Sequence, residues 1–144
     1  MRLARSFALV LTFVAVVEPR PAEAAAYRLG VGANYWFEKS GIFDLTLAIT
    51  TPVAPRFSVG GRFGAALVTS PSTAALPLDL VLRGTFRRVY VEGVAGPWLF
   101  FEGDAVRAHV GLGIGLRARN ISAGIELAYL DPDAILGLKI SFPL

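Results

Sequence analysis

The chain has 144 residues, enough for one small domain, and 54% of them are hydrophobic. The 14 Lys and Arg against 11 Asp and Glu give a formal net charge of +3. These charges form no basic cluster of the kind that binds nucleic acid. The chain contains no cysteine, so a disulfide framework is excluded.

The N-terminus has the pattern of a secretory signal peptide. Arg2 and Arg5 precede an apolar stretch over residues 7–17, and small residues suited to cleavage follow. That stretch is shorter than the roughly 20 apolar residues that a spanning helix needs. We therefore expect residues 1–24 to be a signal peptide, cleaved between residues 24 and 26, and residues 25–144 to be the mature domain.

Apolar and polar residues alternate along nearly all of the mature part, which is the pattern of half-buried strands. Without a second long apolar run, an exported and hydrophobic chain can cross a bilayer only as a closed sheet. The sequence thus predicts an all-β fold, a closed antiparallel up-and-down transmembrane β-barrel of about eight strands. We place the strands near residues 26–38, 42–50, 56–68, 75–86, 88–101, 107–118, 121–130 and 134–142.

The apolar series should face lipid, as in Leu76, Leu78, Leu80 and Leu82. Aromatic residues gather at the two ends of these series, as they do at lipid headgroups. We expect one girdle on the periplasmic side, from Tyr27, Phe57, Phe86 and Phe142. A second girdle should lie on the outer side, from Tyr35, Phe37, Phe43, Phe101 and Tyr129.

Two short turns set the expected strand registers. A two-residue turn at residues 87–88 places Arg83 opposite Glu92, and a similar turn at residues 119–120 places Gly113 opposite Glu126.

Two longer loops set two further registers. If residues 70–74 form a loop, Gly64 faces Asp79 with Arg62 on the diagonal. If residues 102–105 form a loop, His109 faces Trp98 and Gly115 faces Glu92.

Opposite charges then meet inside the barrel. The expected lumen charges are Arg28, Asp44, Arg56, Arg62, Asp79, Arg83, Glu92, Arg117, Glu126 and Lys139. The candidate site within this set is the network of Arg62, Asp79, Arg83, Glu92, Glu126 and Lys139. Because about eight strands leave an interior that side chains can fill, the favoured role is a structural plug. The alternative is a gate, in which Arg83 exchanges between Asp79 and Glu92 to open a thin water path.

Enzyme and cofactor motifs are weak. Gly111, Gly113 and Gly115 lie within a strand pattern, whereas a phosphate-binding glycine loop opens a helix. We expect these glycines to make room for bulky lumen side chains. His109 has no serine at a neighbouring same-face position, so it fits a packed residue near Trp98 better than a general base or a metal ligand. No catalytic residue, cofactor or metal site is expected.

The strand pattern, the signal peptide and the closing strand ending at Phe142 together resemble the small OmpA-like outer-membrane barrels. The resemblance covers residues 27–144 and implies a barrel with short periplasmic turns and a filled polar lumen. The family's last strand commonly ends in an aromatic residue that the assembly machinery reads; here Phe142 or Leu144 would serve. The candidate outer loops are short, and their acids, Glu102, Asp104, Asp131 and Asp133, are either solvated turn residues or bridges to divalent cations.

The sequence therefore predicts a monomeric barrel in the outer membrane of a Gram-negative bacterium, with a structural or interaction role or at most a narrow pore. Its expected partners are outer-membrane lipids, lipopolysaccharide and, during insertion, the barrel-assembly machinery. Two alternatives stay open: an exported soluble lipocalin-like barrel that binds a hydrophobic ligand, and an outer-membrane enzyme that modifies lipid.

Overall fold

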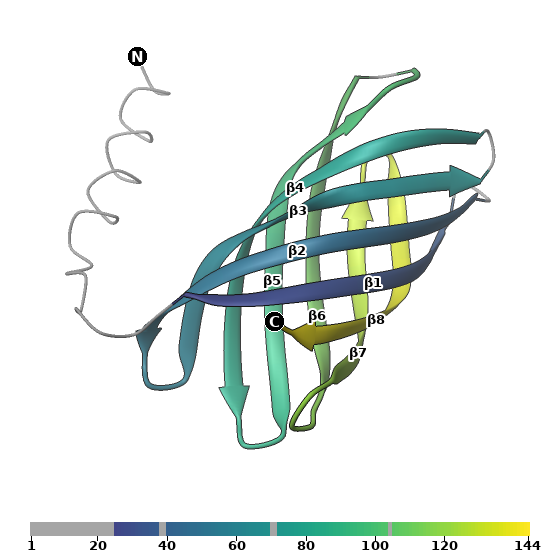
Figure 1. The fold of residues 1–144 in the computed structure, drawn as a ribbon. Helices are drawn as coiled ribbons and strands as arrows, with labels where there is room; N and C mark the ends of the chain where they lie inside the picture. Colours follow the sequence, from purple (N-terminus) through teal and green to yellow (C-terminus); the bar gives the residue numbers. More distant parts are fainter. Residues whose placement is uncertain (1–24, 38–39, 70–71, 104) are drawn as a thin grey trace, which may run out of the picture.

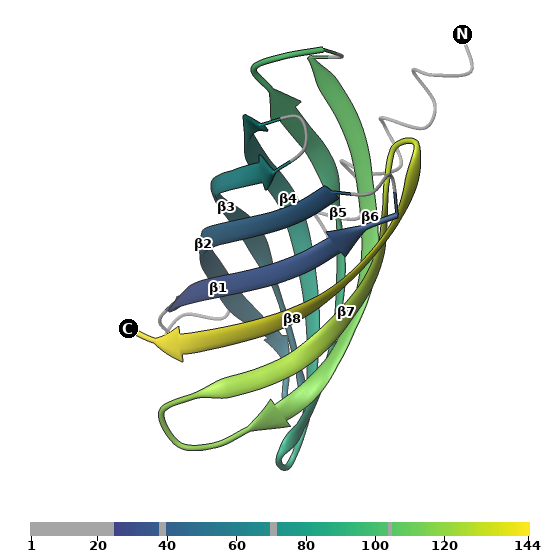
Figure 2. The same ribbon diagram turned by 90° about the vertical axis from the view of Figure 1, so that its right-hand side faces the viewer.

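The computed structural model describes residues 25–37, 40–69, 72–103 and 105–144, and in them eight strands form one closed antiparallel barrel (Figures 1 and 2). Each strand pairs with its neighbours in the sequence, and the last pairs with the first. The predicted fold class is confirmed. The strands are β1 (Ala26–Trp36), β2 (Ser40–Ala54), β3 (Phe57–Thr69), β4 (Ser72–Phe86), β5 (Val89–Phe100), β6 (Val106–Arg117), β7 (Ser122–Leu130) and β8 (Asp133–Pro143).

The expected signal peptide falls on residues 1–24, outside the described part of the chain. Within the described part, no helix has the length and apolar character needed to cross a membrane.

The barrel has two distinct ends. At the turn end lie both ends of the barrel domain and the connections β2–β3, β4–β5 and β6–β7; at the loop end lie the other four connections. A two-residue turn joins Phe86 to Val89, with Arg87 at a φ of 60°. Ala118 N donates to Ile121 O (2.8 Å) in the next turn. The described connections between the strands are short at both ends of the barrel.

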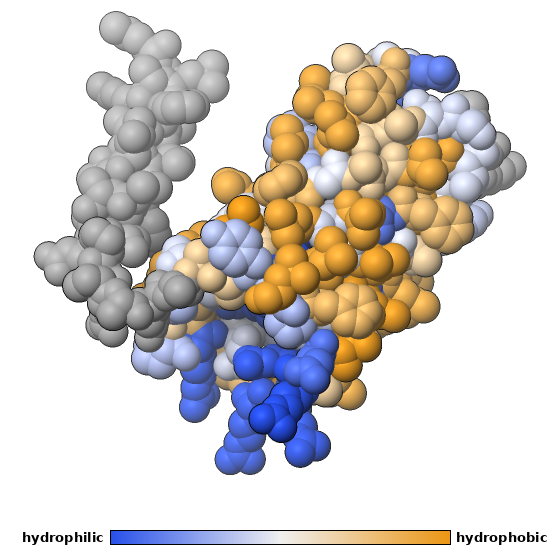
Figure 3. Space-filling view, in the orientation of Figure 1, coloured by the Kyte–Doolittle hydropathy of each residue, from blue (hydrophilic) through white to orange (hydrophobic). Residues whose placement is uncertain are grey.

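The period-two pattern sorts side chains between lipid and lumen as predicted. Along β4, Leu80 is 72% exposed while the next residue, Val81, is 1% exposed. Outward leucines, valines, isoleucines and aromatic residues give the barrel an apolar outer surface, and Figure 3 shows one face of it in orange. The two aromatic girdles also lie where the sequence placed them: all nine rings are exposed, four toward the turn end and five toward the loop end.

The largest difference in strand length is in β2, which continues to Ala54 rather than ending at Thr50. Pro52 lies within this extension of the strand. The register of β2 against β3 shifts between Pro52 and Ala54, which indicates a β-bulge. Proline has no backbone N–H to donate, and the bulge lets the strand continue past it.

Glycines on the inner face let the strands coil tightly. A Cβ on Gly60 would overlap the Ile49 carbonyl oxygen of the neighbouring strand, so only glycine permits that approach. Gly115 instead makes room for a side chain: its Cβ would lie 2.6 Å from the Tyr90 hydroxyl. The expectation that lumen glycines accommodate bulk is confirmed at this position.

Candidate functional site

The lumen at the loop end is closed by an apolar plug. It consists of the buried residues Trp36, Ile42, Ala66, Val68, Ala75, Trp98, Phe100, Ala128, Leu130 and Ile135. Trp36 Nε1 donates to the Leu130 carbonyl oxygen (3.0 Å), which satisfies the polar atom of this ring. The Arg107 guanidinium lies 5.2 Å from the Trp36 ring centre and 5.1 Å from that of Phe100. Aromatic and aliphatic packing thus fills this end.

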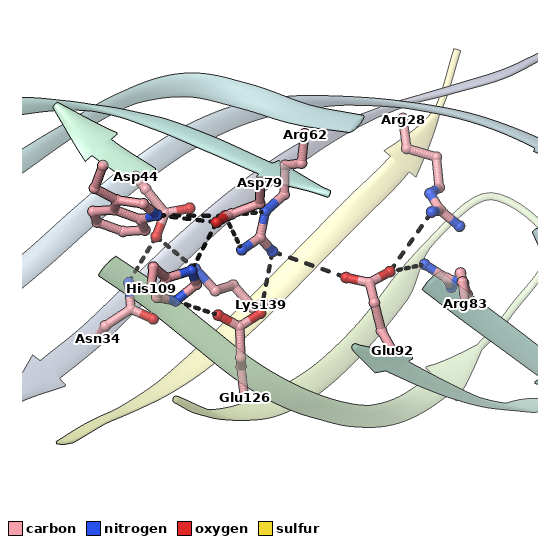
Figure 4. A network of polar contacts seen from close by, with 11 residues as sticks. Arg28, Asn34, Asp44, Arg62, Asp79, Arg83, Glu92, His109, Glu126 and Lys139 are labelled. Atoms are coloured by element: carbon pink, nitrogen blue, oxygen red, sulfur yellow. Dashed lines mark hydrogen bonds and ion pairs between the residues drawn. The ribbon is translucent and has the colours of Figure 1, made fainter. Parts of the chain in front are cut away.

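Toward the middle of the barrel, Asp79 is the centre of a fully buried set of contacts (Figure 4). Its carboxylate accepts from Arg62 Nη2 (2.9 Å) and from Trp98 Nε1 (3.3 Å). His109 Nδ1 lies 2.8 Å from Asp79 Oδ1, whereas Arg62 Nη2 contacts Asp79 Oδ2. Since a carboxylate held by Arg62 can only accept, His109 Nδ1 carries the proton in this contact. We call Arg62, Asp79, Trp98, His109 and Glu126 the Asp79 cluster.

Arg62 ties opposite walls of the barrel together. From β3 it donates Nη1 to Glu126 Oε2 on β7 (3.1 Å), while its other nitrogens hold Asp79 on β4. His109 Nε2 lies 3.8 Å from the second Glu126 oxygen. Each buried charge therefore has an opposite partner, which is what an interior of low polarity requires.

A second set of contacts lies nearer the turn end, around Glu92. Glu92 Oε2 is 3.3 Å from Arg83 Nη1 and 3.7 Å from Arg28 Nη2, and Glu92 Oε1 is 3.8 Å from Arg62 Nη1. The Arg83 guanidinium also stacks 3.8 Å from the Tyr90 ring centre. We call Arg28, Arg83, Tyr90 and Glu92 the Glu92 cluster. Its contacts are longer than those of Asp79, and the Glu92 side chain is 14% exposed where that of Asp79 is 0%.

A third, smaller group joins β8 to β2 and β1. Lys139 Nζ donates to Asp44 Oδ2 (2.6 Å), and Asn34 Nδ2 donates to the same oxygen (2.7 Å). These contacts explain why residue 32 is a glycine. A Cβ on Gly32 would lie 2.6 Å from Lys139 Nζ.

Five of the six candidate residues therefore meet in one network: Arg62, Asp79, Arg83, Glu92 and Glu126. The sixth, Lys139, faces the lumen as expected but pairs with Asp44.

Two other expected lumen charges lie elsewhere. Arg56 is exposed at the turn end, with its guanidinium 5.7 Å from the outward ring of Phe86, because it belongs to the β2–β3 turn rather than to a strand. Arg117 lies at the mouth of the lumen, exposed.

Two of the four expected registers are confirmed and two are wrong. Arg83 pairs with Glu92, and Gly113 pairs with Glu126. Asp79 lies opposite Arg62 rather than Gly64, because β3 and β4 continue to the pair Thr69–Ser72.

Between β5 and β6, His109 lies opposite Gly96 rather than Trp98, and Glu92 lies opposite Gly113 rather than Gly115. Both errors are shifts of two residues, so the side chains keep the predicted face.

Contacts across the lumen were missed by the sequence reasoning. The His109–Asp79 and Arg62–Glu126 contacts join strands that are not neighbours in the sheet. Asn34 and Tyr90 were likewise not singled out. The only available signal was their inward parity, shared with every second residue of their strands.

The described residues line an inner cavity and a larger one at the turn end of the barrel. The inner cavity, of about 40 Å³, touches both clusters, and Arg62, Glu126 and Glu92 are among its lining residues. The larger cavity, of about 320 Å³, lies at the turn end, lined by residues from the ends of β1, β2, β3, β4, β6, β7 and β8. Arg28 and Arg83 line both the inner cavity and the cavity at the turn end. The inner cavity holds only a few waters, since one water needs about 10–15 Å³ by this measure.

The single histidine of the chain is held on both sides. Both His109 nitrogens face carboxylates, and the residue is 1% exposed, so neither nitrogen is free to activate a hydroxyl group. Among residues 25–37, 40–69, 72–103 and 105–144, no group of three or more His, Cys, Asp or Glu is placed to hold a metal ion.

Comparison with known proteins yields a structural likeness only. No protein-family model matches the chain, and no curated protein sequence does so either. A de novo designed transmembrane β-barrel is similar, with a TM-score of 0.67 at 13% identity over 85% of this chain and 98% of that one.

Two natural barrels are similar as well. The N-terminal barrel domain of Pseudomonas aeruginosa OprF has a TM-score of 0.56 at 11% identity, over 85% of this chain and 100% of that one. The outer membrane enzyme PagL has a TM-score of 0.56 at 12% identity, over 81% and 98%. The chain has the fold of small outer-membrane β-barrels. At these identities, the likeness carries the fold and nothing about activity.

Proposed function

We propose that this chain is an OmpA-like outer-membrane barrel with a closed lumen, whose role is structural or interactive and which offers at most a narrow water path. The observation that carries the proposal is the filling of the interior. The apolar plug and the Asp79 cluster occupy successive levels of the lumen, and the inner cavity between the charged clusters measures only about 40 Å³. Such an interior suits a scaffold better than an open channel.

The exposed surface supports a place in the membrane. A belt of outward leucines lies between two aromatic girdles, which is the arrangement that a bilayer stabilises. We propose export through the N-terminal signal peptide to the outer membrane of a Gram-negative bacterium, with the barrel as a monomer among phospholipid and lipopolysaccharide. The barrel-assembly machinery would insert it, reading Phe142 or Leu144 at the closing strand.

Planar-bilayer recording tests the closed lumen. The full chain, expressed in a Gram-negative host and purified from the membrane fraction, should migrate differently on gels before and after heating, and should give no conductance steps beyond those of a protein-free bilayer. Large and steady steps from heat-modifiable protein would contradict a filled interior.

A gate is the second candidate, favoured by one observation. Glu92 lies 3.3 to 3.8 Å from three arginines, Arg28, Arg62 and Arg83, so its partners can exchange. Arg83 contacts Glu92 and not Asp79 in the described state, which makes Glu92 the residue to change. If the gate exists, Glu92→Gln alters the frequency or size of small openings; identical recordings from the two proteins would count against it.

The outward position of Leu112 tests membrane residence directly. Leu112 is 68% exposed at the middle of β6, so Leu112→Arg should lower the free energy of unfolding in lipid vesicles by about 2–4 kcal/mol if this position is near mid-bilayer. Asn120→Arg, in the exposed β6–β7 turn, adds the same charge to an aqueous position and should be nearly neutral. Equal, small effects of both substitutions would argue against the proposed membrane span.

The two alternative functions have less support. A lipocalin-like carrier needs its apolar side chains inside, whereas here they face outward; a mature protein that stayed in solution without detergent would revive it. A lipid-modifying enzyme needs a free base and a nucleophile in reach, and His109 offers neither nitrogen. Mass spectrometry of lipid A with and without the gene should show no difference.

A further inference from the structure

The cavity of about 320 Å³ at the turn end has a lining unlike the rest of the lumen. Four arginines line it: Arg28 on β1, Arg83 on β4 and Arg117 on β6 reach it from strands, and Arg119 reaches it from the β6–β7 turn. No Asp or Glu side chain belongs to its lining, whereas the hydroxyl groups of Thr50, Ser58, Thr85 and Ser122 do. We call this cavity the arginine vestibule.

The arginines of the vestibule are short of negative partners. Arg28 and Arg83 share the single carboxylate of Glu92, at 3.7 and 3.3 Å. Within the part of the chain that the structure describes, Arg117 makes no ion pair at all. By contrast, the carboxylates Asp79 and Glu126 nearer the loop end hold Arg62 at 2.9 and 3.1 Å. The vestibule therefore carries an uncompensated positive charge.

That charge lies where water is partly excluded. The Arg28 side chain is only 16% exposed and that of Arg83 only 4%, so their field is less screened than that of surface arginines. Desolvated guanidinium groups without a full set of acceptors are costly, and an anion that entered the cavity would supply them.

The lining chemistry defines the class of anion. Planar guanidinium forks match the oxygens of a phosphate group two at a time, and hydroxyl groups can donate to the remaining oxygens. Ser122 Oγ already lies 3.5 Å from Arg83 Nη2, so hydroxyl and guanidinium groups converge on one region.

We propose that the arginine vestibule is a binding site for a phosphate group, held by Arg28, Arg83 and Arg117 with help from the hydroxyl groups of Ser58, Thr85 and Ser122. The site is independent of whether the lumen conducts, since it needs only the cavity at the turn end.

Two sources could supply the phosphate. The cavity opens at the level of the aromatic girdle formed by Tyr27, Phe57, Phe86 and Phe142, where the headgroups of the adjoining leaflet would lie. It also faces the aqueous compartment beyond the turns. The ligand is thus either a lipid headgroup or a free phosphate ester.

Titration with inorganic phosphate tests the site. With the purified full chain in phosphatidylcholine nanodiscs at constant low ionic strength, binding can be followed by calorimetry and by the NMR signals of the arginine side chains. We expect saturable binding that shifts the signals of Arg28, Arg83 and Arg117. Arg117→Gln should weaken it about tenfold, because one of the guanidinium groups that hold the phosphate is lost.

Two further variants separate a built site from a diffuse positive charge. Arg88→Gln removes the same charge from the same end of the barrel, but Arg88 does not line the vestibule, so binding should change by less than about twofold. Glu92→Gln should strengthen binding about three- to tenfold, because it frees Arg28 and Arg83. A gain of this kind is not produced by misfolding.

Lipid composition identifies the source. If headgroups reach the vestibule, nanodiscs with phosphatidylglycerol should weaken the apparent binding of inorganic phosphate severalfold by competition. If binding is the same in both lipids, the site takes a free phosphate ester. Absence of saturable binding in phosphatidylcholine nanodiscs, or equal losses from Arg117→Gln and Arg88→Gln, would overturn the proposal.

Discussion

The Asp79 and Glu92 clusters use the same groups in two different ways. Asp79 is fully buried, accepts short hydrogen bonds from Arg62 and His109 at 2.9 and 2.8 Å, and accepts a third, longer one from Trp98. Glu92 is partly exposed, and three arginines stand around it at 3.3 to 3.8 Å. Buried groups whose hydrogen bonds are all satisfied hold one conformation. Partly exposed groups with longer contacts can exchange partners or bind a ligand. The difference indicates that stability resides at Asp79 and adaptability at Glu92.

The largest expected effect is at Asp79. Asp79→Ala leaves Arg62 partly unpaired and removes the acceptor of His109, so the free energy of unfolding should fall by about 3–5 kcal/mol. Equilibrium unfolding in lipid vesicles, followed by tryptophan fluorescence, measures this. Asp79→Asn keeps one acceptor oxygen and should cost less. A loss below about 1 kcal/mol for Asp79→Ala would remove the distinction between the clusters.

An intermediate effect is expected from added volume. Gly32→Ala places a methyl group against Asp44 and Lys139 and should cost about 1–3 kcal/mol. Gly113→Ala makes the same change beside Glu92, where the nearest contacts of the new atom would be 3.4 to 3.9 Å, and should be nearly neutral. Paired thermal or chemical unfolding of the two variants measures the packing of each region. Similar losses would mean that the Glu92 region is as tightly packed as the other.

The smallest effect on stability is expected at Glu92 itself. Glu92→Gln keeps the shape of the side chain and an acceptor for Arg83, and the neighbouring cavities let water solvate the freed guanidinium groups. The free energy of unfolding should fall by about 1–2 kcal/mol, because Arg83 is only 4% exposed and loses a charged partner while keeping an acceptor. A loss as large as that of Asp79→Ala, in the same unfolding assay, would show that Glu92 is a second structural centre.

Sequence reasoning succeeded where a local rule was sufficient. Because side chains alternate between the faces of a strand, the inward position of Asp79 and the outward position of Leu80 follow from parity alone. The pair Arg83–Glu92 was also predictable, since a two-residue turn fixes the register of its hairpin.

The sequence did not predict strand registers across longer loops, or contacts that depend on the curvature of the barrel. The β3–β4 and β5–β6 registers were each wrong by two residues, because the sequence does not say how far a ladder continues into a loop. The Arg62–Glu126 contact depends on which walls of the closed sheet face each other. Strand alternation carries no information on that geometry.

The pairing of β1 with β8 has a consequence for biogenesis. Arg28 lies opposite Pro143, and Leu144 N donates to Tyr27 O (2.9 Å), so the seam joins segments separated by more than a hundred residues. The ring cannot shut before the ribosome has delivered its final strand. Until then both edges remain unpaired and open to aggregation, and closure carries the entropic cost of a very large loop. Closure of the sheet is thus a post-translational step, because it requires the last strand of the chain.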